Sequence, residues 1–392
     1  METVLNPLLY IAFAIVVWHG FRLRAQHRRH WGISLFSPGR ISVIQLLTAV
    51  AVGTVWSTII VLSEWDAGLS LAHVWWLWAV VILLGLVRVR FMGFSYAAGA
   101  VSLLALVSQW LDASVLDSVS RSWVLSLQSV DVKNLLLLAS GFIAISGLLM
   151  IWSGDHSYFP VLLAHRGKSI GAIALQALWA VPLLLHTSNG WLILPALLVY
   201  SDLAVTRYAK QRARITGMWT VAFGIVLAVL SFTSLYIEAF LWVGAMWSLI
   251  GQEVMIRLSD WQERNGVPKF RSPGDGIRVL AVKADSPAAE MGILPGETIT
   301  HANGQAVRNM TELYAALQMS PAFCKLEVVN EDHEQRFAQR SLYANEPHQL
   351  GIIPVGESAP VEGRLPHRLG WWTLFMGRTD YRGNVTENRL EG

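Results

Sequence analysis

Residues whose types and spacing could support catalysis are few in this chain. The nearest string to a catalytic motif is His333-Glu334-Gln335-Arg336-Phe337. A zinc hydrolase of the H-E-x-x-H type needs a second histidine one helical turn after the first, so that both imidazoles face the metal and the glutamate acts as base. Phe337 stands at that position, and the string lies in a predicted turn. The motif therefore predicts no metal site. A catalytic Ser–Lys dyad needs no such spacing, so the sequence does not exclude one.

Two acidic residues lie within otherwise apolar stretches, where a charge is expensive and often functional. They are Asp202 and Glu238, and Gln45 and Gln176 are neutral polar residues in similar surroundings. Both acids fall near the ends of apolar stretches, where a side chain reaches water or lipid headgroups. No series of acids follows one helix face, as a proton relay would require. We interpret these residues as interfacial or packing groups, and a transport role stays an alternative.

The composition indicates a membrane protein with a soluble C-terminal part. Of the 392 residues, 54% are hydrophobic and 15% are charged, which is far more apolar than an average soluble protein. Residues 1–250 carry a net charge of +6, and residues 251–392 carry −3. No basic run with interleaved aromatic residues predicts a nucleic-acid groove. Cys324 is the single cysteine, so an intrachain disulfide is excluded.

Apolar runs predict an α-helical polytopic membrane domain of about nine spans. The runs cover residues 4–18, 41–62, 72–87, 93–111, 135–152, 170–185, 191–204, 216–230 and 236–250. Loops 20–40, 88–90, 153–168 and 206–214 hold thirteen Lys and Arg residues, and the intervening loops hold only Arg121 and Lys133. Because basic loops stay on the cytoplasmic side, we expect the N-terminus outside and the segment after residue 250 inside.

Residues 276–307 show a distinctive order of local signals. Residues 277–282 alternate β-branched and polar side chains, as a half-buried strand does. Ser286 and Pro287 fit the N-cap and first position of a short helix, which Gly292 ends. A strand over residues 298–302 follows, and Asn303-Gly304 is the dipeptide that a tight hairpin turn prefers.

This order resembles a bacterial PDZ domain, over residues 267–355. It implies a small α+β PDZ-like domain of the permuted bacterial type, with further strands over 323–329, 335–341 and 352–355. Asn309 and Glu312 form a capping box for a helix that ends near residue 319. We expect a multispan domain at 1–250, a connector at 251–272, the PDZ-like domain at 273–355 and an aromatic, basic tail at 356–392.

A PDZ domain binds an extended peptide between an edge strand and a helix, and the N–H groups of a hydrophobic-Gly-hydrophobic loop hold the terminal carboxylate. Leu350-Gly351-Ile352 fits this loop and continues into Ile353. Gly274-Asp275-Gly276-Ile277 is the competing loop, which the negative charge of Asp275 disfavours. The resemblance places the helix side of the groove at four residues, with three others facing the core. The groove residues are Thr311, Tyr314, Ala315 and Gln318, and the core residues are Leu313, Ala316 and Leu317.

The tail after residue 355 combines Trp371, Trp372 and Phe375 with several arginines. Such a segment fits an anionic membrane surface, and packing against the PDZ-like domain is an equal alternative.

The whole layout resembles the MinJ-type proteins of Gram-positive bacteria. The resemblance is carried by GFRLRAQHRRH after the first span, by YFPVLLAHRGKSIGAIALQALWAVPLL, and by the single C-terminal PDZ-like domain. It implies a non-enzymatic scaffold of the cell membrane, without cofactor or metal, that acts in division-site placement by bridging DivIVA to MinC and MinD. A regulator that presents substrates to a membrane protease and a transporter are the alternative functions.

Overall fold

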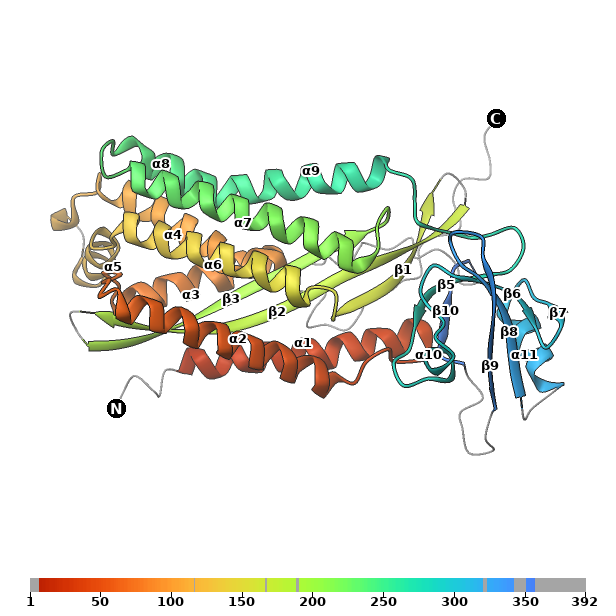
Figure 1. The fold of residues 1–392 in the computed structure, drawn as a ribbon. Helices are drawn as coiled ribbons and strands as arrows, with labels where there is room; N and C mark the ends of the chain where they lie inside the picture. The colour runs from red at the N-terminus through yellow and green to blue at the C-terminus, as the bar shows by residue number, and fades with distance from the viewer. Residues whose placement is uncertain are drawn as a thin grey trace, which may run out of the picture.

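The computed structural model describes residues 7–115, 117–165, 168–187, 190–319, 323–341 and 350–356. Figure 1 shows an elongated helical region through which a long β-hairpin runs, and a smaller β-rich region at one end of it. The helical region covers the sequence up to α9, and the β-rich region contains the segment that resembles a PDZ domain.

The helical region is built from apolar helices. They are α1 (Pro7–Trp31), α2 (Pro38–Leu62), α3 (Leu71–Val87), α4 (Phe94–Ser108), α5 (Ser118–Gln128), α6 (Val132–Ser153), α7 (Ala209–Thr233), α8 (Ala239–Met246) and α9 (Gln252–Asn265). Short turns η2 (Val89–Met92) and η3 (Ala113–Val115) flank α4, and the π-helical turn η4 (Trp247–Gly251) joins α8 to α9. Five segments of the described chain are long and apolar enough to cross a membrane, and α3 and α4 are shorter apolar helices. The five are Pro7–Trp31, Gly39–Leu62, Val132–Ser153, Ala209–Thr233 and Ala239–Glu263.

The prediction of about nine spans is therefore wrong. The segments expected to form spans at 170–185 and 191–204 are strands, β2 (Lys168–Thr187) and β3 (Gly190–Ala204), which pair antiparallel. Pro182 lies opposite Pro195 near the middle of this hairpin. Figure 1 shows the β2–β3 hairpin running along the helical region.

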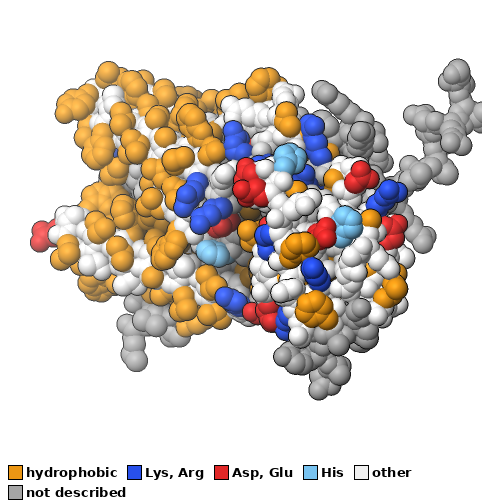
Figure 2. All heavy atoms as spheres, turned by 45° about the vertical axis from the view of Figure 1, so that its right-hand side comes forward, with side chains coloured by type: hydrophobic (Ala, Val, Ile, Leu, Met, Phe, Trp, Pro, Cys, Tyr) orange, Lys and Arg blue, Asp and Glu red, His pale blue; other side chains and the backbone are white. Residues whose placement is uncertain are grey.

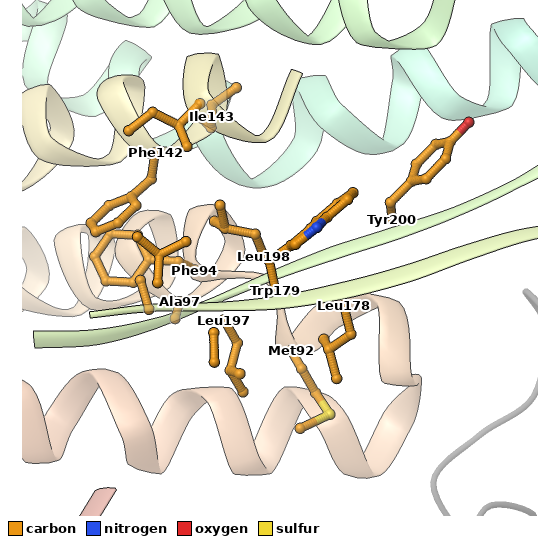
Figure 3. Close-up of a cluster of buried hydrophobic side chains, with 14 of the residues drawn as sticks. Met92, Phe94, Ala97, Phe142, Ile143, Leu178, Trp179, Leu197, Leu198 and Tyr200 are labelled. Carbon is orange, nitrogen blue, oxygen red and sulfur yellow. The ribbon is translucent and has the colours of Figure 1, made fainter. Parts of the chain in front are cut away.

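The hairpin resembles two spanning helices in sequence because helices cover both of its faces. Figure 3 shows Leu178 and Trp179 pointing to opposite sides of β2, and Leu197 and Leu198 to opposite sides of β3. All four side chains are buried. A strand buried on both faces loses the alternation of apolar and polar residues and becomes one continuous apolar run. Length and hydropathy alone cannot separate such a run from a helix.

Helices also satisfy hydrogen-bonding groups along the hairpin. The backbone N–H of Leu184 donates to the Ser57 hydroxyl at 2.8 Å, and the Trp78 indole donates to the Pro195 carbonyl at 3.1 Å. Non-helical backbone is tolerated at membrane depth only where protein buries it and partners its polar groups. The hairpin meets that condition at these two positions.

The first helix also differs from expectation. Residues 20–31, expected to begin a basic loop, remain helical to the end of α1. This basic end of α1 holds β1 (Tyr158–His165): the His27 ring contacts the Tyr158 carbonyl through Nε2 at 3.0 Å, and the Trp31 indole donates to the Pro160 carbonyl at 3.0 Å. Basic residues of α1 are thereby fixed beside the β-rich end of the molecule.

The β-rich region confirms the strands and helices predicted for it and adds one two-residue strand, at 305–306, that was not predicted. They are β5 (Ile277–Val282), α10 (Pro287–Glu290), β6 (Thr298–Ala302), β7 (Gln305–Ala306), α11 (Met310–Gln318), β8 (Phe323–Val329), β9 (Gln335–Ser341) and β10 (Ile352–Pro354). The Ser286 hydroxyl accepts from Ala289 N–H, and the Asn309 side chain accepts from Glu312 N–H, so both predicted caps form. The sheet order is β10-β5-β6-β8-β9, with β7 against β6.

The two regions are joined through the sheet of the hairpin. After α9, β4 (Phe270–Arg271) pairs with one edge of β2, opposite Ile170 and Gly171. The other edge of β2 pairs with β1 at these positions. β4 therefore continues the line of β3 along β2. The connector predicted at residues 251–272 is thus a helix followed by a strand that ties the β-rich region to the hairpin.

Candidate peptide-binding site

The predicted binding loop lies at the edge of the β-rich sheet. β10 is the last strand in the order β10-β5-β6-β8-β9, so in the described chain only one of its edges is paired. Its register places Ile352 opposite Val282 and Ile353 opposite Ala281. An extended peptide could add to the unpaired edge as a further strand.

The backbone of the loop presents two adjacent N–H groups to that edge. The Leu350 carbonyl accepts from Ala288 N–H at 3.0 Å, and the Gly351 carbonyl accepts from Lys283 N–H at 2.8 Å. In a trans peptide the carbonyl and the following N–H point in opposite directions. The N–H groups of Gly351 and Ile352 therefore point away from β5 and α10. Successive N–H groups with a common direction form the concave anion site that a peptide carboxylate requires.

Gly351 is required at this position for two reasons. Its φ of +79° lies in the left-handed region, which residues with a Cβ rarely adopt. A Cβ atom there would also lie 2.5 Å from the Cβ of Ser286. The loop geometry therefore depends on glycine.

The strand's side chains divide between two cores. Leu350 and Ile352 pack in the β-rich core with α11. Ile353 and Val355 instead pack against Phe270 and Leu280, within the core that continues into the helical region. Gly351 hydrogen-bonds to Lys283 after β5, and backbone direction alternates along a strand. The backbone of Ile353, two residues later and opposite Ala281, therefore also faces β5. The structure thus leaves Ile353, one of the predicted contacts, outside the candidate groove.

Pro354 limits how far a peptide could pair with β10. The backbone N–H of Val355 donates to the Arg278 carbonyl on β5. Because backbone direction alternates along a strand, the backbone of Pro354 faces outward, like that of Ile352. A proline at an outward position costs the sheet no hydrogen bond. It also offers no N–H to a peptide, so that pairing is confined to the start of the strand.

The helix side of the site follows the predicted pattern of burial. Leu313, Ala316 and Leu317 are buried in the same core as Leu350 and Ile352. The four predicted groove residues of α11 remain accessible. Thr311, Ala315 and Gln318 are exposed, and Tyr314 is half-buried against the core.

The competing loop has a different place. Gly276 directly precedes β5, a strand with neighbours on both sides, and Ile277 pairs with Ile299 of β6. A Cβ on Gly276 would lie 2.8 Å from the Ile299 carbonyl oxygen. Gly276 therefore serves the packing of β5 on β6, whereas the sheet edge belongs to Gly351.

A polar cluster fixes the β-rich region against the start of α7. Lys269 Nζ forms an ion pair with Glu331 Oε2 at 2.6 Å. The same ammonium group lies 4.8 Å from the centre of the Tyr208 ring. Burial and the Glu331 carboxylate raise the pKa of Tyr208, so its hydroxyl stays protonated and donates to Glu331. The orientation of the candidate groove relative to the helices is thus held by specific contacts.

Asp202, singled out from the sequence, belongs to a buried ion cluster. Arg212 donates to Asp202 through Nε at 2.8 Å and Nη2 at 2.7 Å, and its Nη1 lies 3.2 Å from Glu263. Glu263 also accepts from the backbone N–H groups of Val205 and Thr206. The cluster joins β3, α7 and α9, so Asp202 has a structural role. Glu238, in contrast, is exposed before α8.

Two other sequence expectations concern sites elsewhere. No group of three or more His, Cys, Asp or Glu residues in the described part of the chain could hold a metal ion. The aromatic and basic tail, including Trp371 and Trp372, lies outside the described residues.

The fold defines a protein with helices long and apolar enough to cross a membrane, followed by a small β-rich domain. Residues 278–330 match the PDZ domain family. A segment of 57 residues is 40% identical to the periplasmic serine endoprotease DegP of Salmonella typhimurium, but it covers only 14% of this chain and 12% of DegP.

The longer matches are to MinJ, and they confirm the resemblance predicted from the sequence. The chain is 28% identical over 310 residues to the cell division topological determinant MinJ of Bacillus subtilis, covering 67% of this chain and 78% of MinJ. It is 29% identical over 262 residues to the "Probable cell division topological determinant MinJ" of Lacticaseibacillus paracasei, covering 62% and 71%. The chain is a homologue of these proteins, and its PDZ domain fits a role in protein–protein interaction.

Proposed function

We propose that this chain is a non-enzymatic membrane scaffold that recruits proteins to the division site through its PDZ groove. The observation that carries the proposal is the pair of outward N–H groups at Gly351 and Ile352, on a strand edge that no other described strand pairs with. This arrangement suits a peptide that adds to β10 and ends in a carboxylate. The homology to MinJ supports a role in division-site placement. DivIVA, MinC and MinD are the partners that the MinJ-type resemblance suggests.

The proposed topology places the N-terminus outside the cell and the PDZ domain in the cytoplasm, with several membrane passes. The thirteen basic residues within 20–40, 88–90, 153–168 and 206–214 support this orientation. The proposed orientation also fits the β2–β3 hairpin, because a hairpin in place of two predicted spans has both of its ends on the same side.

Photocrosslinking in cells tests the proposal. A photoreactive residue at Thr311 or Gln318, both exposed on α11, should capture the same partner. The matched control is Phe337, which is 60% exposed on β9 at the opposite edge of the sheet. Capture of DivIVA, MinC or MinD from α11 but not from β9 is expected. Equal capture from both edges, together with uniform distribution around the cell and normal division after deletion, would contradict the proposal.

A regulator that presents substrates to a membrane protease is the second candidate, favoured by the short similarity to DegP. In that case crosslinks from Thr311 would identify a protease, and deletion would change its cleavage without producing filaments or minicells.

A further inference from the structure

A cavity of about 770 Å³ lies between the helical region and the PDZ domain. Its wall is formed by the ends of α1 and α6, the start of α2, the α1–α2 connection and the loop after β5. Its polar lining includes Arg24, Arg28, Arg40, Gln45, Ser157 and Lys283. Figure 2 shows apolar side chains covering the helical region, while basic side chains gather where it meets the PDZ domain. The volume falls within the range of small-molecule sites.

The cavity wall carries excess positive charge. Arg24, Arg28, Arg40 and Lys283 line it, against the carboxylates of Asp155 and Asp285. None of these four cations forms an ion pair with a carboxylate in the part of the chain that the structure describes. Basic side chains that outnumber the carboxylates beside them, and form no ion pair with those carboxylates, favour an anionic ligand.

Buried polar atoms in the wall supply an independent indication. Gln45 is 4% exposed, and neither its amide oxygen nor its amide nitrogen has a hydrogen-bond partner among the described residues. The Ser157 hydroxyl and the Arg24 Nε are likewise buried and have no partner within the part of the chain that the structure describes. Buried polar side chains almost always have a partner, because desolvation of an unpaired group is costly. A ligand with both hydrogen-bond donors and acceptors would satisfy them.

The remaining wall is apolar on the side of the bundle. Ile41 and Ile44 lie beside Gln45 on α2, within a helix that is apolar enough to span a membrane. Arg40 and Arg28 lie towards the ends of α2 and α1. Charge is thus concentrated at the helix ends, and apolar surface continues into the helical region.

We propose that this cavity binds a phosphate group, held by Arg24, Arg28 and Arg40 and hydrogen-bonded by Gln45. Arginine suits this role because its planar guanidinium matches phosphate oxygens in pairs. The apolar wall of α2 favours an anionic phospholipid as the source of the phosphate, and a soluble phosphate compound would meet the same donors. The site is separate from the proposed peptide groove, although Lys283 adjoins both.

Native mass spectrometry of the full chain in detergent tests the proposal. The probes are phosphatidylglycerol and phosphatidylcholine with identical acyl chains, each with and without inorganic phosphate. Phosphatidylglycerol should be retained more strongly. Each arginine beside an anionic headgroup contributes about five-fold in affinity, so the double variant Arg24→Gln with Arg28→Gln should weaken retention of phosphatidylglycerol on the order of 25-fold. The matched control is Lys210→Gln with Arg214→Gln, which removes the same charge from exposed positions near the start of α7.

A second variant protects the test against failure of folding. Gln45→Leu removes the unpartnered amide from α2 and should also weaken retention of phosphatidylglycerol, while leaving phosphatidylcholine unchanged. Displacement of the lipid by inorganic phosphate alone would support the phosphate site and assign its source to a soluble compound. Equal retention of the two lipids would overturn the proposal. Equal losses of phosphatidylglycerol retention in the cavity and control variants would also overturn it. The same holds if Gln45→Leu makes the protein more stable and leaves retention of phosphatidylglycerol unchanged.

Discussion

The backbone N–H of Lys283 donates to the carbonyl of Gly351 at 2.8 Å, so one residue borders both the candidate peptide loop and the basic cavity. This hydrogen bond fixes the direction of the Gly351–Ile352 peptide, and therefore the outward N–H of Ile352. The start of β10 is thus positioned by the same segment that closes the cavity beside the helical region.

Gly351→Ala should disrupt the loop more than an ordinary substitution of a left-handed glycine. The backbone cost of placing alanine at φ +79° is about 1–2 kcal/mol. The clash with Ser286 adds about 1–3 kcal/mol. Hydrogen exchange of β5 and β10 in the full chain should rise accordingly.

Gly304→Ala is the matched control for that substitution. Gly304 has φ +82°, but no atom of the described residues lies within 4 Å of an added Cβ. It should incur the backbone cost alone, and equal exchange rates in the two variants would contradict the proposed contact with Ser286.

The PDZ domain was predictable because its signals are local. The Ser286 cap, the Asn303-Gly304 turn and the Asn309 cap each lie within a few residues of the structure they specify. The hairpin was not predictable by the same means, because burial of both faces removes its alternation. Length and composition then favoured helices for both strands.

Contacts between distant segments explain the rest of what the sequence did not reveal. Asp202 was noticed as an acid in an apolar run, but Glu263, which shares Arg212 with it, follows that arginine by 51 residues. Similarly, Arg24, Arg28 and Arg40 were interpreted only as signals of topology. Nothing local in the sequence indicates that Lys283 and Gln45 complete one cavity with them.

Docking of the PDZ domain through Glu331 should depend on pH. Burial alone would raise the pKa of Glu331, but hydrogen bonds from Lys269 and Tyr208 outweigh it and lower the pKa below its usual value of 4.5. The native state therefore binds fewer protons than the unfolded chain. The stabilisation is present above the usual pKa and is lost as the pH falls through the lowered one.

The size of that effect is limited by exposure. The Lys269 and Glu331 side chains are 32% and 34% exposed, so the loss should stay below about 1 kcal/mol. The thermal unfolding temperature of the full chain should fall less steeply from pH 7 to pH 3 for Glu331→Gln than for wild type. Asp332→Asn, at an exposed neighbouring position, should retain the wild-type slope, and a flattened slope in both variants would refute the assignment to Glu331.

The crossing of α6 and α7 should not tolerate side chains at its closest point. A Cβ on Gly147 would lie 2.6 Å from the Gly217 carbonyl oxygen, and a Cβ on Gly217 would lie 2.6 Å from the Gly147 carbonyl oxygen. Small residues permit such close packing of apolar helices. Gly217→Ala should destabilise the protein in detergent by about 1–3 kcal/mol. Gly39→Ala on α2, where an added Cβ meets nothing within 4 Å, should cause no loss; equal melting temperatures for the two variants would exclude this packing.

Asp202→Asn should reduce stability, and any loss of function should follow from reduced abundance. Asp202 and Arg212 are 7% and 1% exposed, so the substitution leaves a buried guanidinium with one carboxylate partner fewer. Breaking a buried pair costs about 3–5 kcal/mol, and the lower end applies because Glu263 still contacts Arg212. Thermal unfolding in detergent measures this loss, and Glu238→Gln, at an exposed position, should match wild type. If Asp202→Asn instead left stability and abundance unchanged while abolishing function, the carboxylate would have a direct role and a transport function would regain support.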